Sequence, residues 1–397
     1  MKKILIITPR FPVPTSGACE QDRAEGMKQL KRLGNEIQVI GKVFDFQNKE
    51  NIEKFSRENY IPVHLVPYRY TQKKSLWRNF LYHLRRFIWP PYWDGSVYEY
   101  ADPAIKNKLT EVLENWRPDI VWFDYTFMLP LYPIARRFGC KIITHSLVYD
   151  PNNLLEEEGG GLLNHFRAKI KTVTERASVK NSDYVFAITP DEEKLYRKLG
   201  AKNIQTLPLR ALYNFLGENE VAVDKKILNV FFMGSSYNIK HNLQAVKFII
   251  EEVVPLANKK YPDKFKFFIT GGKMPEDLRK KCVNNINYLG FVDDIGGFLR
   301  DMDIALVPSL FGAGMQQKIF EPLARGFPVI ISQRGLVGYD FECGREVLCA
   351  SNAEEFTARL GQLLDFNFRK KISSQAAIKS RNSFSREKSD AIILKAI

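Results

Sequence analysis

Residues 308–321 read Pro-Ser-Leu-Phe-Gly-Ala-Gly-Met-Gln-Gln-Lys-Ile-Phe-Glu, and residues 322–330 continue Pro-Leu-Ala-Arg-Gly-Phe-Pro-Val-Ile. This stretch predicts a strand end, a glycine loop, a short helix and a second buried strand. Glycines before a helix let backbone N–H groups approach an anion, and the helix dipole favours negative charge there. Lys318 and Glu321 lie three residues apart and share one face of the predicted helix. The pair suits a ligand with both phosphates and sugar hydroxyls.

The whole chain has the composition of an ordinary folded protein with a basic balance. Its 397 residues suit two domains rather than one core. A hydrophobic content of 45% argues against a disordered chain. The net charge of +14 favours an anionic partner, but it does not choose among nucleotide phosphates, nucleic acid and an acidic membrane surface.

Five cysteines are spread widely along the chain and form no Cys-x-x-Cys pair: Cys19, Cys140, Cys282, Cys343 and Cys349. This pattern predicts neither a disulfide framework nor a zinc site, and it favours a reducing cytoplasm. The apolar run at residues 4–7 is too short for the core of a signal peptide. No stretch approaches the roughly 18 apolar residues of a membrane span. We therefore expect a cytoplasmic protein, either soluble or peripheral at the inner face of the membrane.

Strand-like runs alternate with amphipathic helical segments in both halves of the chain, which predicts two parallel sheets covered by helices. The predicted fold class is α/β, with two doubly wound Rossmann-like domains facing across a cleft. Periodicity is lost from residue 207 to 226, the best linker candidate. The predicted divisions are an N-terminal domain at 1–207, a linker at 208–226, a C-terminal domain at 227–375, and a C-terminal helix at 376–397 that packs back toward the N-terminal domain.

Two further loops follow predicted strands at the edge where such sheets bind ligands. The first carries prolines and Gly17 ahead of a helix, and by itself it is an ordinary strand–helix turn. The second carries Gly234 and Ser235, with Lys240 just before the next helix. These residues suit a diphosphate, and a surface lysine near a helix cap is an equally good interpretation.

The order of these motifs resembles the donor domain of glycosyltransferase family 4, the "group 1" family with the GT-B fold. Beside the opening stretch, the resemblance rests on segments in the family's order: residues 231–236, 267–272, 285–294, 303–309 and 344–348. The first half matches more loosely through residues 11–17, 117–121 and 143–145. The Gly-Ala-Gly-Met sequence at 312–315 resembles that of one subgroup.

The resemblance implies a role for each matching residue. Glu321 holds the ribose of the nucleotide, and Phe291 reads the base through its main chain. His145 lies near the transferred sugar, and we expect it to be catalytic together with Glu321 and Lys318. Asp124 is a candidate acceptor-side carboxylate, and a helix cap is as good an interpretation of it. The donor-binding residues implied by the resemblance are Gly17, Gly234, Ser235, Lys240, Gly272, Phe291, Gly314, Met315, Gln316, Lys318 and Glu321.

The resemblance further implies transfer of a sugar from a nucleotide-sugar donor, bound by the C-terminal domain at 227–375, to a glycan or lipid-linked acceptor, bound by the N-terminal domain at 1–207. It implies retention of configuration, no metal, no cofactor, and a place in cell-surface polysaccharide or glycolipid biosynthesis. Two departures from the family pattern stand out. Ala313 replaces the first glutamate of a pair, and Ser235 replaces an arginine, so Lys240 and Lys318 carry more of the phosphate charge. These departures leave open a catalytically silent GT-B protein that binds a nucleotide-sugar or a partner glycosyltransferase.

Residues 73–93, from Lys73 to Trp93, combine basic residues with apolar side chains at helical spacing. Two interpretations stay open: a core-packed helix with a solvated basic face, and a helix that lies on an anionic membrane surface. Nucleic acid is not an expected partner, because the basic residues are scattered and no recognisable binding module is present.

Overall fold

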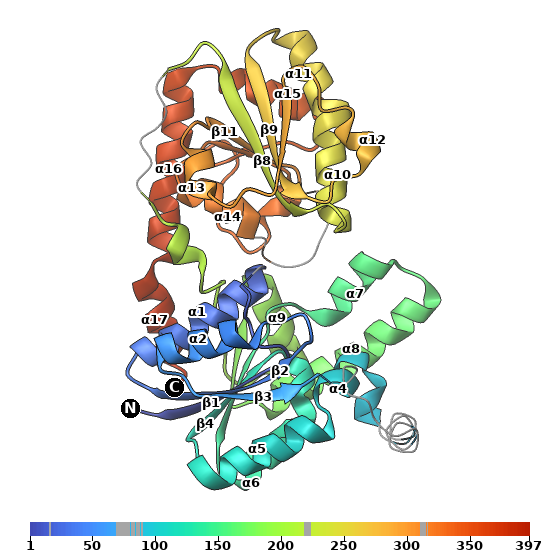
Figure 1. The fold of residues 1–397 in the computed structure, drawn as a ribbon, viewed down its shortest axis with the longest axis vertical. Helices are drawn as coiled ribbons and strands as arrows, with labels where there is room; N and C mark the ends of the chain where they lie inside the picture. The colour runs from blue at the N-terminus through green and yellow to red at the C-terminus, as the bar shows by residue number, and fades with distance from the viewer. Residues whose placement is uncertain are drawn as a thin grey trace. The chain divides into compact units, whose positions relative to one another are not determined.

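The computed structural model describes residues 1–15, 17–68, 80, 84, 88, 90–217, 224–309, 315 and 317–397, with only the main chain of residues 157 and 317. Contacts divide the chain into two compact units. The N-terminal unit comprises Met1–Ala211 and Glu387–Ile397, and the C-terminal unit comprises Leu212–Arg386. Each unit contains one parallel sheet covered by helices (Figure 1). The predicted α/β fold with two Rossmann-like units is confirmed.

The sheet of the N-terminal unit has the strand order β3-β2-β1-β4-β5-β6-β7, and all its pairs are parallel. Its strands are β1 (Lys3–Thr8), β2 (Glu36–Val43), β3 (Val63–Pro67), β4 (Ile120–Asp124), β5 (Lys141–His145), β6 (Tyr184–Ala187) and β7 (Ile204–Thr206). The strand order reverses between β1 and β4. The loops after these two strands therefore diverge, as at the ligand sites of doubly wound sheets.

Helices cover both faces of this sheet (Figure 1). Helices α1 (Ala18–Arg32) and α2 (Lys49–Asn59) lie on one face, and α5 (Pro103–Trp116) and α6 (Tyr132–Arg137) lie on the other. The remaining helices among the described residues of this unit are η2 (Pro90–Trp93), α4 (Gly95–Tyr100), η3 (Thr126–Leu131), α7 (Asp150–Glu158), α8 (Leu162–Asn181), α9 (Pro190–Leu199) and α17 (Arg386–Leu394).

The C-terminal helix α17 packs within the N-terminal unit. Its Asp390 accepts hydrogen bonds from Gln29 at 2.7 Å and from Arg32 at 2.8 Å, both on α1. Ile393 and Ala396 are fully buried in the same core as α1. The longer helix before it, α16 (Phe366–Phe384), belongs to the C-terminal unit, and the two helices are separated at Ser385.

The sheet of the C-terminal unit has the strand order β10-β9-β8-β11-β12-β13, which reverses between β8 and β11. Its strands are β8 (Leu228–Ser236), β9 (Phe265–Gly272), β10 (Ile286–Gly290), β11 (Ile304–Val307), β12 (Val329–Ile331) and β13 (Leu348–Cys349). Its other helices are η4 (Leu212–Phe215), α10 (Lys240–Phe248), η5 (Ile249–Val253), α11 (Val254–Lys260), α12 (Glu276–Arg279), α13 (Ile295–Leu299), α14 (Gln317–Ala324), η6 (Gln333–Leu336) and α15 (Ala353–Gln362). In Figure 1, α10, α11 and α15 lie on one side of this sheet, and α14 and α16 on the other.

A disulfide joins Cys343 and Cys349, so the prediction drawn from the wide cysteine spacing is wrong at this pair. Gly344 has a φ of 86°, and its N–H donates to the carbonyl of Val347 at 2.7 Å. This turn brings the two Cα atoms to 5.4 Å, within the range that a disulfide bridges. The spacing of the two residues alone does not reveal the turn.

Buried charges are paired inside the N-terminal unit. Lys42 on β2 is fully buried, and its Nζ donates to Asp102 at 2.8 Å and to the carbonyl of Glu99 at 2.7 Å. Asp102 also caps α5, because its Oδ1 accepts from the N–H of Ile105 at 3.1 Å. One carboxylate thus neutralises a buried cation and caps the start of a helix.

We expect Asp102→Ala to lower the free energy of unfolding by about 3–5 kcal/mol, since it removes the cap and leaves Lys42 as an uncompensated buried charge. Urea unfolding followed by circular dichroism measures this change. The double variant Lys42→Met/Asp102→Asn should recover most of the loss, because no buried charge remains. An Asp102→Ala loss below about 1 kcal/mol would contradict the pairing.

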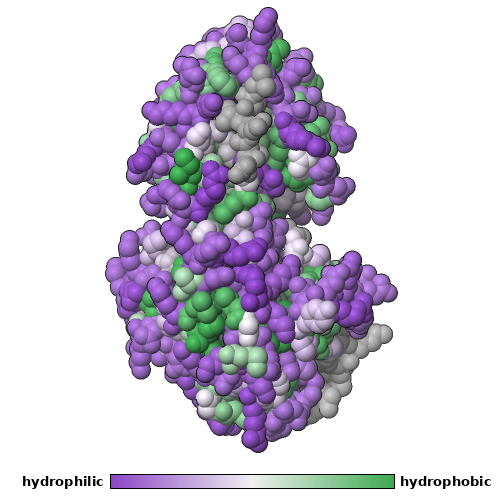
Figure 2. Space-filling model, turned by 90° about the vertical axis from the view of Figure 1, so that its left-hand side faces the viewer, coloured by the Kyte–Doolittle hydropathy of each residue, from purple (hydrophilic) through white to green (hydrophobic). Residues whose placement is uncertain are grey.

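Figure 2 shows one side of the molecule, where hydrophilic residues predominate and apolar residues form separate patches. Within the described residues, no helix is both long enough and apolar enough to cross a membrane. The segment 73–93 lies largely outside the described residues, so both interpretations of it stay predictions.

Candidate active site

Two glycines let the ends of β8 and β9 pack closely in the C-terminal unit. A Cβ on Gly234 would lie 2.6 Å from the Tyr237 hydroxyl oxygen, and a Cβ on Gly271 would lie 2.6 Å from the Gly234 carbonyl oxygen. Gly271 also has a φ of 123°, which L side chains rarely adopt. Tyr237 is buried beneath them and donates to the Thr270 carbonyl at 2.5 Å. A Cβ added at Gly272 would have no atom of the described residues within 4 Å.

A chain of hydrogen bonds links the end of β8, which contains Gly234 and is called the glycine loop below, to helices α10 and α14. Asn242 on α10 donates to the Ser235 hydroxyl and to the Ser236 carbonyl, both at 3.1 Å. The Nζ of Lys318 on α14 donates to the Asn242 side-chain oxygen at 3.1 Å. Lys318 is therefore linked through Asn242 to the carboxyl end of β8, at the point where the strand order of this sheet reverses.

Burial makes the charge of Lys318 sensitive to its surroundings. It lowers the pKa of Lys318 to about 8. Burial and the nearby charge of Lys318 lower the pKa of His241 to about 4, so this histidine is neutral at physiological pH. An anion bound beside Lys318 would interact with a buried cation. Because little water surrounds this lysine, the ionic interaction would be strong.

Glu321 lies on α14 one turn after Lys318. Burial raises the pKa of Glu321, while the Arg325 guanidinium opposes this rise and donates to the carboxylate at 3.1 Å. Lys240 is exposed at the first position of α10, and the cap residue Ile239 makes no side-chain hydrogen bond. A helix start without a side-chain cap is a favourable place for a phosphate.

The structure brings several of the predicted donor-binding residues to one edge of the sheet. Ser235 and Lys318 are joined by the Asn242 hydrogen bonds, Gly234 directly precedes Ser235 on β8, and Gly272 pairs with Ser236 on the neighbouring strand. Phe291 follows β10 at the outer end of the same sheet and is 73% exposed. Met315 is buried. Gly314 and Gln316, as well as Ala313, lie outside the described residues.

The N-terminal unit contains a second polar group, which lies between α1 and the carboxyl ends of its central strands. Asp124 ends β4, His145 ends β5, and the two are register partners in the parallel pair. Both are buried. The carboxylate of Asp124 accepts from the indole N–H of Trp122 at 3.2 Å. Gly17 belongs to the same unit, at the N-cap of α1.

An ion pair lies directly against His145. Both oxygens of Asp22 on α1 accept from Arg210: Oδ1 from the main-chain N–H at 2.6 Å, and Oδ2 from the guanidinium at 2.7 Å. The same guanidinium lies 3.2 Å from His145 Nδ1. Arg23 on α1 is buried as well and donates to the Thr8 hydroxyl at 2.8 Å.

These contacts determine the charge states of the group. Burial, helped by Arg210, lowers the pKa of His145 to about 3, so its ring is neutral at physiological pH. Burial alone would raise the pKa of Asp22, but Arg210 and His145 hold it below its ordinary value. Burial raises the pKa of Asp124, against the opposing influence of Arg210 and Arg23.

The sequence prediction missed Asp22, Arg23 and Arg210. Arg210 falls in the segment predicted as a linker, yet its side chain is 2% exposed. Asp22 and Arg23 look like solvated helix positions, because the sequence does not show which side of α1 faces the strand ends. The one sequence signal that could have pointed to this group is Gly26, the lone glycine on α1. In the structure a Cβ at this position would lie 1.9 Å from the Arg210 guanidinium, so a larger residue would collide with it.

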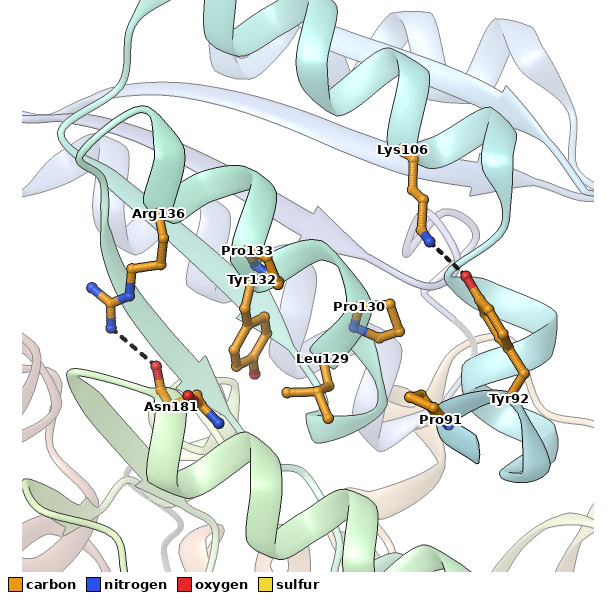
Figure 3. Close-up of a pocket in the computed structure, with 9 residues that line it drawn as sticks. All are labelled: Pro91, Tyr92, Lys106, Leu129, Pro130, Tyr132, Pro133, Arg136 and Asn181. Atoms are coloured by element: carbon orange, nitrogen blue, oxygen red, sulfur yellow. Dashed lines mark hydrogen bonds between the residues drawn. The ribbon is translucent and has the colours of Figure 1, made fainter. Parts of the chain in front are cut away.

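A cavity of about 690 Å³ lies elsewhere in the N-terminal unit (Figure 3) and is lined by none of the predicted site residues. Its polar groups pair with one another. Lys106 donates to the Tyr92 hydroxyl at 2.5 Å, and Arg136 donates to the Asn181 carbonyl at 3.0 Å. We assign the candidate chemistry to the two strand-end groups instead.

Within the part of the chain that the structure describes, no group of three or more histidine, cysteine or acidic residues could hold a metal ion. The expectation that the reaction needs neither metal nor cofactor stays a prediction.

Comparison with known proteins gives a family for each half of the chain. Residues 25–210 match the family described as glycosyl transferase 4-like domain, and residues 228–365 match the family described as glycosyl transferases group 1. The first match contains Arg210 as well as Asp124 and His145. The second contains the glycine loop, Lys318 and Glu321. No curated protein matches the chain at a significant level of sequence similarity.

Solved structures share the fold over the full length of the chain. Sucrose-phosphate synthase from Thermosynechococcus elongatus aligns with a TM-score of 0.69 at 11% identity, covering 100% of this chain and 98% of the other. Anabaena HepE, solved in complex with UDP, aligns at 0.66 and 13% identity, covering 100% and 99%. An E. coli structure described as trehalose-6-phosphate bound with UDP-2-fluoro glucose aligns at 0.63 and 14% identity, covering 99% and 98%. These likenesses show that the fold is GT-B, and the two family matches, one to a glycosyl transferase 4-like domain and one to a group 1 domain, identify the chain as a nucleotide-sugar-dependent glycosyltransferase.

Proposed function

We propose that this enzyme transfers a hexose from a UDP-linked donor to a glycan or lipid-linked acceptor, with retention of configuration, in the synthesis of a cell-surface polysaccharide or glycolipid. In this proposal the C-terminal unit binds the donor without a metal, and the N-terminal unit binds the acceptor. The enzyme works in the cytoplasm, at or near the inner face of the membrane. It belongs to the subgroup with a Gly-Ala-Gly-Met loop.

One observation supports the proposal: Lys318, Asn242 and the carboxyl end of β8 form one connected group where the strand order of the C-terminal sheet reverses. Such a position binds ligands in doubly wound sheets, and a lysine among backbone amides suits a diphosphate. Glu321, one helical turn further, supplies a carboxylate for ribose hydroxyls. The choice of uridine rests on the complexes of similar structures with UDP and UDP-sugars.

In this proposal the N-terminal unit supplies two side chains for the transfer step, the carboxylate of Asp124 and the imidazole of His145. Departure of the nucleoside diphosphate leaves positive charge on the sugar and negative charge on the leaving group. Lys318 and the backbone amides stabilise that negative charge. Asp124, whose pKa burial raises, accepts a hydrogen bond from the acceptor hydroxyl.

A thermal-shift screen of nucleoside diphosphates and their sugars tests the donor assignment. We expect UDP and one UDP-sugar to raise the melting temperature, because a ligand at about 100 times its Kd stabilises by about 2.7 kcal/mol. Product analysis by NMR with that donor then reports the anomeric configuration. Nucleotide binding without turnover of any donor in the panel would favour the silent nucleotide-sugar-binding protein.

Glu321→Gln separates nucleoside binding from diphosphate binding. Since a hydrogen bond to a charged group contributes about 1.5–3 kcal/mol, UDP affinity should fall about 10- to 100-fold. Affinity for inorganic pyrophosphate should stay unchanged, because pyrophosphate has no ribose. Calorimetric titration measures both affinities, with Glu276→Gln, an exposed residue of α12, as the matched control. Equal losses for UDP and pyrophosphate would contradict a ribose contact.

A further inference from the structure

Arg210 reaches into the interior of the N-terminal unit from the segment after β7. Its guanidinium lies between Asp22, whose Oδ2 it contacts at 2.7 Å, and His145, whose Nδ1 it contacts at 3.2 Å. The indole of Trp122 lies on another side, with its ring centre 5.5 Å from the guanidinium carbon. All four side chains are buried. The position of Arg210 is therefore fixed by an ion pair and by an aromatic ring.

This contact determines which nitrogen of His145 holds the proton. A guanidinium has only donors, so His145 Nδ1 must be the acceptor in the 3.2 Å contact. A neutral imidazole has one protonated nitrogen, and its proton must then be on Nε2. Asp22 Oδ2 lies 3.8 Å from Nδ1, too far to hold a proton on that side by a hydrogen bond.

The Nε2 atom of His145 is buried and makes no hydrogen bond to any residue that the structure describes. The ring packs edge-on against Trp122 and Phe186, at centroid distances of 6.0 and 6.4 Å. A buried donor without a partner costs free energy, so such a group in a native protein points to a ligand oxygen or a water.

We propose that Arg210, held by Asp22, is a positioning residue that keeps His145 in the Nε2–H tautomer, so that His145 presents a hydrogen-bond donor to an oxygen of the sugar substrate. The last part rests on the proposed function, which assigns His145 to the transfer step. Arg210 itself touches neither substrate nor reacting atoms in this proposal.

The charged and titratable groups around the His145 ring favour its neutral form, which acts here as a hydrogen-bond donor and not as a base. Arg210 and Arg23 both oppose a second proton on His145, and Asp22 alone favours it. Asp124 faces the group from the neighbouring strand. Because burial and Arg210 lower the pKa of His145 to about 3, the imidazole does not take up a proton in the physiological range.

Nitrogen NMR of the full chain labelled with ring-15N histidine tests this assignment. The chain has five histidines, and the His145 signals are identified by their loss in His145→Gln. We expect wild-type His145 to have a bare Nδ1 and a protonated Nε2, and to stay neutral between about pH 5.5 and about pH 8. In Arg210→Met the proton should move to Nδ1, on the side of Asp22, and the titration midpoint should rise, because burial still lowers the pKa of His145 but the opposing charge of Arg210 is gone. A wild-type proton on Nδ1, or an unchanged tautomer in Arg210→Met, would overturn the proposal.

Arg210→Met leaves Asp22 without its buried partner and so tests folding as well. Gly26→Ala keeps the charges of Asp22 and Arg210. It changes only the position of the Arg210 guanidinium, since the added Cβ would lie 1.9 Å from it. This variant should alter the His145 tautomer in the same direction. The control is Arg137→Met, an exposed arginine of the same unit, which should leave all His145 signals in place.

Kinetics separate this proposal from the function on which it rests. Gly26→Ala should lower kcat about 10²-fold, because misplacing a catalytic group by about 1 Å has an effect of that size, and should leave UDP affinity unchanged. A changed tautomer with unchanged kcat would overturn the assignment of His145 to the transfer step while leaving the tautomer assignment intact. An unchanged tautomer with a lower kcat would overturn the role of Arg210 and leave the proposed function intact.

Discussion

Lys318→Met should lower the affinity for UDP about 10- to 100-fold and kcat about 10²- to 10³-fold. The Nζ of Lys318 donates to the side-chain oxygen of Asn242 at 3.1 Å, and Asn242 in turn contacts the end of β8. A hydrogen bond to a charged group contributes about 1.5–3 kcal/mol in the ground state. Charge on the leaving diphosphate grows as the sugar departs, so the same lysine contributes more in the transition state. Calorimetric titration with UDP and initial-rate kinetics with the donor identified by thermal shift measure the two effects.

The pH dependence of UDP binding provides an independent test. Burial lowers the pKa of Lys318 to about 8, and only the protonated form attracts the diphosphate. Affinity should therefore fall as the pH rises from about 7 to about 9.5, with a midpoint above that of the free enzyme, because the bound anion favours the protonated form. The stability of the fold depends on pH in the opposite direction. The folded pKa lies below the ordinary 10.5, so burial of the charge costs stability below about pH 8, and this cost disappears as the pH rises from about 8 to about 10.5.

Matched variants make this test specific. Lys318→Arg keeps a charge that does not titrate in this range, so its UDP affinity should be flat with pH. Lys280→Met removes an exposed lysine of the same unit and should behave as wild type. If Lys318→Met binds UDP as tightly as Lys280→Met does, the diphosphate lies elsewhere.

His145→Asn should lower kcat about 10²- to 10³-fold, the usual effect of removing one preorganised donor from a transition state. UDP affinity should stay within about twofold, because His145 belongs to the N-terminal unit and the proposed UDP contacts belong to the C-terminal unit. Stopped assays at saturating donor measure kcat, and thermal shift with UDP measures binding.

His165→Asn is the control for this prediction, since His165 is exposed on α8 of the same unit. It should retain wild-type kcat. A His145→Asn enzyme with wild-type kcat would show that His145 is a buried structural histidine. Loss of UDP binding in that variant would indicate a general folding defect, which circular dichroism melting detects.

The sequence predicted most of the fold because parallel sheets bury whole strands. Runs such as residues 3–8 and 304–308 are short, apolar and bounded by turn residues, and both were found as strands. Helix α2 is hard to recognise in the sequence because only Ile52 and Phe55 among its residues are apolar, and the others are charged or polar. The helical segment that runs from α10 through α11 is continuous but contains a π turn, Ile249–Val253, which directly precedes α11 and its Pro255. Proline cannot donate its backbone hydrogen bond there.

The candidate donor site could be predicted because its parts are close in sequence. Gly234 and Ser235 lie within eight residues of Asn242, and Lys318 shares its helix with Glu321, so local spacing was informative. What the sequence could not show is that Asn242 joins the two segments, because that contact spans 76 residues.

The amino-acid sequence by itself determined the α/β class, the strand-end glycine loops and the lysine–glutamate pair, since each depends on neighbours along the chain. Only the tertiary structure decided the group around His145. Asp22 and Arg210 are 188 residues apart, and nothing in their local sequences marks either as buried. Burying such charges is costly unless they are paired, and the pairing exists only once α1 and the segment after β7 have packed together. That packing also decides which nitrogen of His145 carries its proton.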